Sequence, residues 1–268
     1  MKTSAENCFT LITGSSSGIG KALAEASARR GMNLALVALP GVELLATVDY
    51  LRSTYHVKVY HLGVDLTEAG ACETVLQWIH HHRLSVNMLI NNAGIGCTGA
   101  FEKFSSEFYQ KQIQLNVIAL TLLTRLLISE LKKHPKAYIF NVGSLSGFFF
   151  VPFKDVYAAT KSFVITFSES LRHELKDTGI HVSVLCPGGV ISNPEAANRL
   201  KHHGWFAQAS ALTCEQVAEE AIIKLLKKKS VVIPGRWNRL VMLLDKIVPA
   251  FITNRIIQSE FKKCAMAL

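Results

Sequence analysis

Short apolar runs alternate with longer stretches along almost the whole chain. Most of the short runs are continuously apolar, which predicts strands that helices cover on both faces. The expected strands are Phe9–Thr13, Asn33–Ala38, Val57–Leu62, Met88–Asn91, Ala137–Val142, His181–Cys186 and Val231–Ile233. The longer stretches are expected to be helices, at Ile19–Arg30, Val42–Thr54, Ala71–His82, Glu107–Lys132, Tyr157–Lys176 and Cys214–Lys228. A capping box of Thr213 and Gln216 is expected to begin the last helix.

The alternation of strand and helix predicts an α/β fold with a doubly wound, seven-stranded parallel sheet flanked by helices. With 268 residues, of which 49% are hydrophobic and 18% charged, the chain can bury a large core and is not typical of a disordered protein. No repeat or linker divides it, so residues 1–268 are expected to form one domain. Within it we expect a substrate loop over about 188–212 and a C-terminal helical extension over about 237–268.

A glycine-rich turn joins the first expected strand to the first expected helix. It reads Thr13-Gly14-Ser15-Ser16-Ser17-Gly18-Ile19-Gly20. Glycines allow the backbone to turn sharply and to approach a pyrophosphate, and the helix start offers free N–H groups and the positive end of its dipole. The spacing differs from the common G-x-G-x-x-G pattern, and a tight turn without a ligand is the alternative interpretation.

Polar residues also follow the third and fourth expected strands. Asp65 could accept a hydrogen bond from an adenine amino group, or it could be a turn residue or helix cap. Asn91-Asn92-Ala93-Gly94 closes the fourth strand. Its small residues would let a cofactor lie close to the backbone, while its asparagine amides are expected to join neighbouring strands.

Tyr157 and Lys161 lie four residues apart in an expected helix, so their side chains share one face. An isolated tyrosine has a pKa of about 10, which is too high for easy proton exchange at neutral pH. A fixed ammonium beside it stabilises the phenolate, so we expect Lys161 to lower the pKa of Tyr157. Ser144 follows the fifth strand, and the loop after it could bring its hydroxyl to the same substrate oxygen.

Together and in this order, these motifs make the sequence resemble the classical short-chain dehydrogenase/reductase family over roughly residues 8–190. The resemblance implies a Rossmann fold and assigns a role to four residues. Tyr157 is the general acid in reduction and the base in oxidation, and Ser144 hydrogen-bonds the substrate oxygen. Lys161 holds the nicotinamide ribose and tunes Tyr157, and Asn116 anchors a water that relays protons to Lys161.

The resemblance also implies a nicotinamide cofactor and a larger assembly. The helices Glu107–Lys132 and Tyr157–Lys176 are expected to build a homodimer or homotetramer. The residues expected to bind the cofactor are Gly14, Ser16, Ser17, Gly18, Ile19, Gly20, Leu39, Asp65, Leu66, Asn92, Ala93, Gly94, Tyr157, Lys161, Pro187, Gly188, Val190 and Ser192.

Cofactor choice is normally read at the end of the second strand, where an acidic residue favours NAD and an arginine favours NADP. Here the segment Leu36–Pro40 carries neither charge, and Ser17 occupies a loop position that is often basic in NADP enzymes. No carboxylate is present to repel a phosphate, and the chain has a formal net charge of +9. These two features favour NADP(H) over NAD(H).

Two segments bear on the substrate. Residues 148–153, with the sequence FFFVPF, are expected either to form an apolar wall beside the reacting carbon or to belong to the core or a subunit contact. Residues 193–212 are expected to form either a mobile lid or an ordinary surface loop. This segment includes Pro194, His202, His203, Trp205 and Phe206. An apolar wall would suit an apolar substrate.

Other signals bear on location and partners. The six cysteines form no C-x-x-C pair, which is typical of free thiols in a reducing compartment. No apolar run reaches the length of a membrane span and no signal peptide is evident, so the cytoplasm is the expected location. His80-His81-His82 lacks metal-ligand spacing, and no metal site is expected. Lys227-Lys228-Lys229 comes without a recognition motif, so no nucleic-acid partner is expected.

The C-terminal segment Trp237–Phe261 carries apolar residues at nearly helical spacing, interspersed with Arg236, Arg239 and Lys246. Pro249 interrupts it, which favours two short helices over one. These helices would pack over the active-site mouth or onto a second subunit. The alternative is an interfacial helix that brings the protein to a membrane and a lipid-like substrate.

The function that these features predict is an oxidoreductase using NAD(P)(H). It would transfer a hydride between nicotinamide and a carbonyl or secondary alcohol of an apolar small molecule, such as a ketone, an acyl compound or a lipid. One alternative is a cofactor-sensing or regulatory binding protein that retains the fold. Another is a membrane-recruited protein in which catalysis is incidental.

Overall fold

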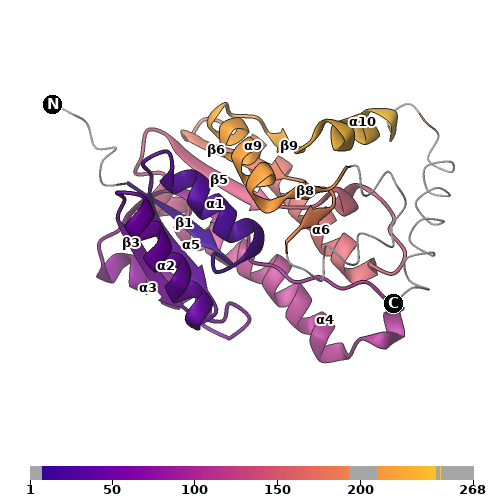
Figure 1. The fold of residues 1–268 in the computed structure, drawn as a ribbon, viewed down its shortest axis with the longest axis horizontal. Coiled ribbons are helices and arrows are strands. Elements are labelled where there is room, and N and C mark those ends of the chain that lie inside the picture. The colour runs from indigo at the N-terminus through magenta and orange to yellow at the C-terminus, as the bar shows by residue number, and fades with distance from the viewer. Residues whose placement is uncertain (1–7, 193–209, 246–247, 249–268) are drawn as a thin grey trace.

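The computed structural model describes residues 8–192, 210–245 and 248 (Figure 1). Seven parallel strands form one sheet in the order β3-β2-β1-β4-β5-β6-β9. The strands are β1 (Cys8–Thr13), β2 (Asn33–Ala38), β3 (Val59–Gly63), β4 (Ser85–Asn91), β5 (Ala137–Val142), β6 (Ile180–Leu185) and β9 (Val231–Val232). The predicted doubly wound sheet of seven strands is therefore confirmed, with strand ends shifted by up to three residues.

Helices connect the strands. They are α1 (Gly18–Ala28), α2 (Val42–Thr54), α3 (Ala71–His81), α4 (Ser106–Ile113), α5 (Leu120–Leu131), α6 (Asp155–Glu174), α9 (Cys214–Leu226) and α10 (Arg236–Asp245). The predicted capping box is present at the start of α9, where Gln216 N donates to Thr213 Oγ1 and Thr213 N donates to Gln216 Oε1. The long predicted helix over 107–132 contains a π-helical stretch, Gln114–Ala119, between α4 and α5. A second sheet of β7 (Val190–Ile191) and β8 (Leu212–Thr213) was not predicted.

The core has two apolar layers, one on each face of the sheet (Figure 1). Successive side chains of a strand point to opposite faces, so Leu36 belongs to the layer that contains α1, α2 and α9, whereas Val37 belongs to the layer that contains α3, α5 and part of α6. Every residue of β2 is buried, which explains why the run is continuously apolar. On the first face, Arg30, which follows α1, also pairs with Glu219 of α9.

A buried polar chain crosses from the sheet to the second helical layer. Asn91 Nδ2 donates to Asn141 Oδ1 on the adjacent strand, at 2.9 Å, and also to Thr124 Oγ1 in α5. Asn141 Nδ2 in turn donates to Ser168 Oγ in α6 at 2.9 Å. The expected role of asparagine amides in joining strands is thus confirmed for Asn91. Because unpaired amides are costly to bury, this chain sets the positions of α5 and α6 against the ends of β4 and β5.

By length and composition alone, the helix Ser106–Leu131 could cross a membrane, a possibility that the apolar runs of the sequence did not indicate. Its apolar side chains Leu123 and Leu127 are fully buried against the sheet, as in the core helix of many globular folds. One such helix is weak evidence for a membrane span.

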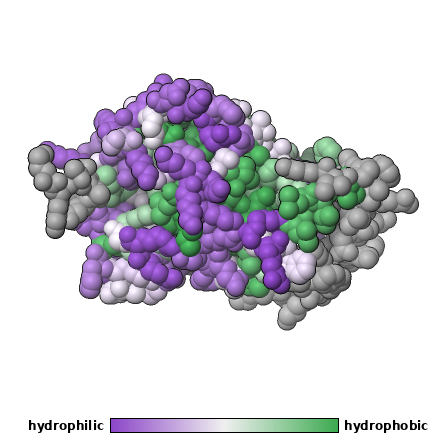
Figure 2. Space-filling view, turned by 90° about the horizontal axis from the view of Figure 1, so that it is seen from above, coloured by the Kyte–Doolittle hydropathy of each residue, from purple (hydrophilic) through white to green (hydrophobic). Residues whose placement is uncertain are grey.

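Two segments singled out in the sequence consist mostly of residues that the structure does not describe. The proposed lid residues between 193 and 209 lie outside the described residues, as does most of the C-terminal extension after α10. Residues Arg236–Asp245 do form a helix, and its apolar side chains Trp237, Leu240, Leu243 and Leu244 are exposed. Figure 2 shows an apolar surface at the end of the molecule where α10 lies.

Leu23 provides a test of the packing between α1 and α9. It is fully buried in α1, so Leu23→Ala should lower the free energy of unfolding by about 2–5 kcal/mol through lost burial and a cavity. Leu45 in α2 is 50% exposed, and Leu45→Ala serves as the matched control, with an expected loss below about 1 kcal/mol. Urea denaturation followed by circular dichroism measures both. Equal losses would contradict the described core.

Candidate active site

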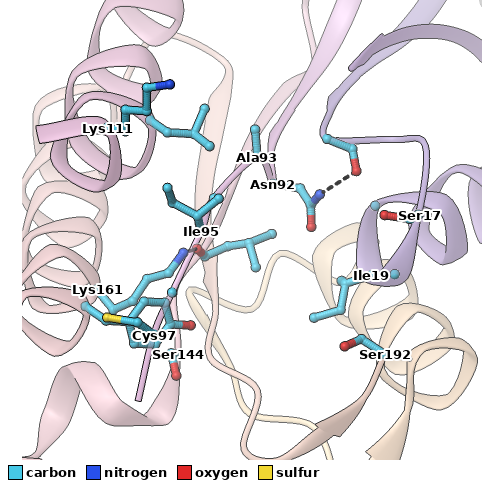
Figure 3. Close-up of a pocket in the computed structure, with 18 of the residues that line it drawn as sticks. Ser17, Ile19, Asn92, Ala93, Ile95, Cys97, Lys111, Ser144, Lys161 and Ser192 are labelled. Carbon is cyan, nitrogen blue, oxygen red and sulfur yellow. Dashed lines mark hydrogen bonds between the residues drawn. The ribbon is translucent and has the colours of Figure 1, made fainter. Parts of the chain in front are cut away.

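A cleft of about 1040 Å³ opens where β1 and β4 end. The strand order reverses between these two strands, and such a switch point is where open α/β sheets bind ligands. The cleft is lined by the glycine-rich turn, by the segments after β3, β4 and β5, by part of α6 and by the residues after β6. Figure 3 shows Ser17, Ile19 and Ser192 on one side and Cys97, Lys111 and Lys161 on the other.

The glycine-rich turn fits the pyrophosphate of a dinucleotide. Gly14 and Gly18 have φ angles of 64° and 54°, which favour glycine. A Cβ atom at Gly20 would lie 2.0 Å from the Gly14 carbonyl oxygen, so only glycine allows α1 to start this close to β1. The Ser17 side chain does not cap α1, and the N–H groups of its first turn are available to an anion.

A hydrogen-bonded clamp holds this turn against the end of β4. Asn92 Nδ2 donates to the carbonyl oxygens of Thr13 and Gly14, at 2.9 and 3.1 Å. Thr13 Oγ1 accepts from the backbone N–H groups of both Asn92 and Ala93 at 3.0 Å. Every one of these bonds joins β1 to β4 across the switch point. Thr13 was not predicted to have this role, although it stands at the first position of the motif.

At the end of β2, the described part of the cleft is lined by no charged side chain that would distinguish NAD from NADP. Leu39 follows β2, lines the cleft and is 60% exposed. Asp65 also lines the cleft, and its Oδ1 accepts from Thr67 N at 2.9 Å and from Thr67 Oγ1 at 2.8 Å. Asp65 is therefore a turn cap that also lines the cleft, and its contact with an adenine stays a prediction.

Ser144, Tyr157 and Lys161 line the same cleft. Ser144 begins a short 3-10 helix, Leu145–Phe148, and its hydroxyl accepts from Ser146 N at 3.2 Å and from Ser146 Oγ at 2.9 Å. Because Ser146 donates both of these hydrogen bonds, the hydroxyl hydrogen of Ser144 remains available to donate to another acceptor. Ser146 was not predicted from the sequence.

Lys161 is buried beneath Tyr157. Its Nζ donates to the Val142 carbonyl oxygen at 2.7 Å and lies 5.7 Å from the centroid of the Tyr157 ring. Burial lowers the pKa of Lys161 from 10.5 to about 8, because the charged form loses its hydration. The neighbouring Cys186 thiol, whose own pKa burial raises to about 12, acts in the opposite direction on Lys161.

The expectation that Lys161 lowers the pKa of Tyr157 was wrong for this structure. Burial raises the pKa of Tyr157, and the influence in the opposite direction is a hydrogen bond with Ser144. Lys161 Nζ lies over the ring and bonds a backbone carbonyl, so its charge is not directed at the phenol oxygen. Burial therefore favours the neutral phenol form of Tyr157.

Asn116 lies behind the cleft and does not line it, unlike every other predicted site residue. It is buried within the π-helical stretch, a geometry that often occurs at functional sites. Its Oδ1 accepts from Ile95 N at 2.9 Å, and its Nδ2 donates to Ile95 O and to Thr160 Oγ1. Asn116 thus ties the segment after β4 to α6, and its water-anchoring role stays a prediction.

Of the two roles expected for residues 148–153, the structure does not support an apolar wall beside the cleft. None of those six lines the cleft; Phe148 packs against the core, and Phe150 is 80% exposed. Phe104 and Phe108 line it instead, with ring centroids 5.2 Å apart. Their spacing of four residues at the start of a helix was the available signal in the sequence.

Comparison with known proteins points to the same kind of enzyme as the residues of the cleft do. The pattern that describes the short chain dehydrogenase family matches residues 9–202. The chain belongs to this family. Its relatives include a ketoacyl reductase, HetN, from Nostoc sp., which is 29% identical over 240 residues covering 90% of this chain and 82% of that protein. A very-long-chain 3-oxoacyl-CoA reductase of Danio rerio is 30% identical over 67% of this chain, which spans 57% of that protein's length.

Solved structures agree with this assignment. A 7beta-hydroxysteroid dehydrogenase superposes with a TM-score of 0.84 at 26% identity, covering 94% of this chain and 97% of that one. A short-chain dehydrogenase from Sphingobium yanoikuyae in complex with NADPH is 31% identical, with a TM-score of 0.75, and covers 89% of this chain and 94% of that one. This short-chain dehydrogenase is accordingly an oxidoreductase acting on CH–OH groups of a small molecule with a nicotinamide cofactor.

The lowered pKa of Lys161 makes stability depend on pH. The unfolded chain keeps this proton up to about pH 10.5 and the folded chain only up to about pH 8. Burial of the charged Lys161 side chain therefore lowers the free energy of unfolding most below pH 8. This cost falls as pH rises from 8 to 10.5. Relative to Lys161→Met, the wild-type protein should gain about 2 kcal/mol of unfolding free energy between pH 7.5 and 10.

Urea denaturation of both proteins across this pH range measures the difference. Lys132 follows α5 and is exposed, so Lys132→Met provides the control for loss of a lysine in general. An equal pH trend for the two variants would show that burial of Lys161 is not the cause.

Proposed function

We propose that this short-chain dehydrogenase is an NADPH-dependent carbonyl reductase in which Tyr157 is the proton donor. The observation that carries the proposal is the shared cleft of Ser144, Tyr157 and Lys161 with the glycine-rich turn. Reduction is the proposed direction because its proton donor must begin as a neutral phenol, and burial, which raises the pKa of Tyr157, favours that form.

When bound in this cleft, a nicotinamide would supply the hydride that the carbonyl carbon accepts. Tyr157 donates its hydroxyl proton to the carbonyl oxygen as negative charge develops there. Ser144 donates a hydrogen bond to the same oxygen, and Ser146 orients it by donating two hydrogen bonds to its oxygen. Two donors fixed before the reaction stabilise the developing alkoxide without further reorganisation.

Lys161 would hold the nicotinamide ribose and replace the proton that Tyr157 has lost. Its lowered pKa, about 8, makes proton release easier than for an ordinary lysine. The proton would then be restored through a water held near Asn116, whose side chain already fixes the Ile95 backbone beside the cleft.

The preference for NADPH rests on the end of β2. Leu39 presents no carboxylate to repel a 2′-phosphate or to accept from a ribose 2′-hydroxyl. The net charge of +9 also attracts the more anionic cofactor. The NADPH complex of the relative from Sphingobium yanoikuyae is consistent with this preference.

An apolar substrate is supported by Phe104, Phe108 and Ile95 along the wall of the cleft. Relatives named for ketoacyl, 3-oxoacyl-CoA and hydroxysteroid substrates act on molecules with large apolar parts. A homo-oligomer is supported by apolar side chains that remain exposed on the helices of the second layer, namely Ile118, Leu122 and Phe163.

Tyr157→Phe tests catalysis. The substitution removes the proton donor and keeps the ring, so NADPH-dependent reduction of an aromatic ketone should fall about 10²–10⁴-fold in kcat. Calorimetric titration with NADPH should show that the variant still binds the cofactor. A protein that binds NADPH but shows no turnover sensitive to this substitution would be the cofactor-sensing alternative.

Leu39→Asp tests cofactor choice. A carboxylate at this position repels the 2′-phosphate and accepts from the 2′-hydroxyl, so the ratio of NADPH to NADH affinity should fall at least tenfold. Calorimetric titration with each cofactor measures the ratio. Leu45→Asp, on the exposed surface of α2, is the control for an added charge. Tighter binding of NADH by the wild-type protein would contradict the proposed preference.

A further inference from the structure

The buried residue of α10 is polar. Within Arg236–Asp245, Asn238 is the buried residue and is 3% exposed. Three leucines of the same helix are exposed, namely Leu240, Leu243 and Leu244. A buried carboxamide is costly unless it is hydrogen-bonded, and an apolar side chain would carry no such requirement. A polar residue at this point of the helix must therefore serve a particular contact.

The carboxamide of Asn238 lies on the backbone of Gly188, a residue after β6 that lines the cleft. A Cβ atom at Gly188 would lie 2.5 Å from Asn238 Oδ1, 2.9 Å from its Cγ and 3.0 Å from its Nδ2. Non-bonded heavy atoms do not pack at 2.5 Å, so only glycine allows the helix to approach this segment so closely. Gly188 is thus the point where α10 contacts the wall of the cleft.

The Asn238 side chain also bonds two carbonyl groups from different segments. Its Nδ2 donates to the Pro234 carbonyl oxygen at 2.9 Å and to the Ser210 carbonyl oxygen at 3.3 Å. Leu212 N, at the start of β8, donates to the Gly189 carbonyl oxygen at 3.0 Å. One carboxamide therefore holds the backbone after β6 and the backbone before β8 against α10.

Glu220 of α9 anchors the start of α10 in this position. Its carboxylate accepts a hydrogen bond from Gly235 N at 2.9 Å and another from the Arg239 guanidinium. Arg239 also donates to the Ile233 carbonyl oxygen at 3.2 Å. Because α9 belongs to the first apolar layer of the core, these bonds tie the start of α10 to that layer.

The segment that α10 supports is joined to the serine of the proposed reaction. Leu145 N, next to Ser144, donates to the Pro187 carbonyl oxygen at 2.9 Å. A nicotinamide that transfers a hydride to a carbonyl beside Ser144 and Tyr157 has to lie at this end of the cleft, because the reacting atoms must meet. The backbone of Pro187 and Gly188 would therefore flank the nicotinamide half of the cofactor.

We infer that Asn238 is a positioning residue for the nicotinamide half of the cofactor, since its carboxamide holds Gly188 and Ser210 against α10. Asn238 does not itself line the cleft and acts through the backbone of Gly188. A wall that is fixed before binding loses less conformational freedom when the cofactor arrives. The inference rests on the proposed use of a nicotinamide cofactor. It gives a role to a helix that follows the residues matched by the family pattern.

Cofactor binding without turnover tests this role. Asn238→Ala removes both hydrogen bonds and the contact with Gly188, so calorimetric titration should show about tenfold weaker binding of NADPH. Binding of 2′,5′-ADP, which has the adenosine end but no nicotinamide, should be unchanged. NADH and 5′-AMP form the matched pair if the wild type binds NADH more tightly. Leu243→Ala, at a 60% exposed position of α10, is the control and should bind every probe as the wild type does.

Gly188→Ala examines the same contact from the other side, because its added methyl group would collide with Asn238. This variant should also bind NADPH about tenfold more weakly. Asn238→Ala makes room for that methyl group, so the double variant should bind NADPH no more weakly than either single variant. Additive losses, or an equal loss of affinity for NADPH and 2′,5′-ADP in Asn238→Ala, would overturn the inference.

The same titrations separate this inference from the proposed function. Selective loss of NADPH affinity in Asn238→Ala supports the positioning role even if the wild type reduces no ketone. Reduction of a ketone by an Asn238→Ala protein with unchanged NADPH affinity would support the proposed function and contradict the positioning role. A wild-type protein that binds neither NADPH nor NADH would overturn both.

Discussion

The pairing of β1 with β4 is the contact on which the rest of the site depends. These strands lie side by side although two strands intervene in sequence, and the reversal of strand order opens the crevice between their ends. Thr13 and Asn92 hold this crevice with four hydrogen bonds between turn and strand end. The same junction fixes the start of α1 and the segment after β4, and both line the cleft.

Burial has opposite consequences for the two titrating groups at the centre of the cleft. It raises the pKa of Tyr157 and lowers that of Lys161, so both are driven toward their neutral forms. A neutral phenol is the form that donates a proton to a carbonyl. A lysine near its titration midpoint is one that can release a proton to replace it. The polar chain from Asn91 to Ser168 supports this arrangement by positioning α6 against β5.

Much of the fold and most of the site were predictable because they depend on local pattern. Continuous apolar runs predicted the seven strands, since a strand such as β2 is buried on both faces. The order of short motifs predicted residues that do line one cleft, because parallel strands bring their carboxyl ends to the same edge. The sequence left open whether residues 148–153 form the wall of the cleft or belong to the core or a subunit contact. Phe104 and Phe108 line the cleft instead, and apolarity alone does not say which segment faces a cavity.

The sequence by itself determined the doubly wound sheet, the glycine-rich turn and the shared face of Tyr157 and Lys161, because each follows from spacing along one strand, turn or helix. Only the tertiary structure decided the direction of the Tyr157 pKa, the π-helical stretch around Asn116 and the contact between Gly99 and Phe153. Each of these depends on burial or on contacts between distant segments. The hydrogen bond from Gly99 to Phe153 joins residues far apart in the chain, and no periodicity encodes such a contact.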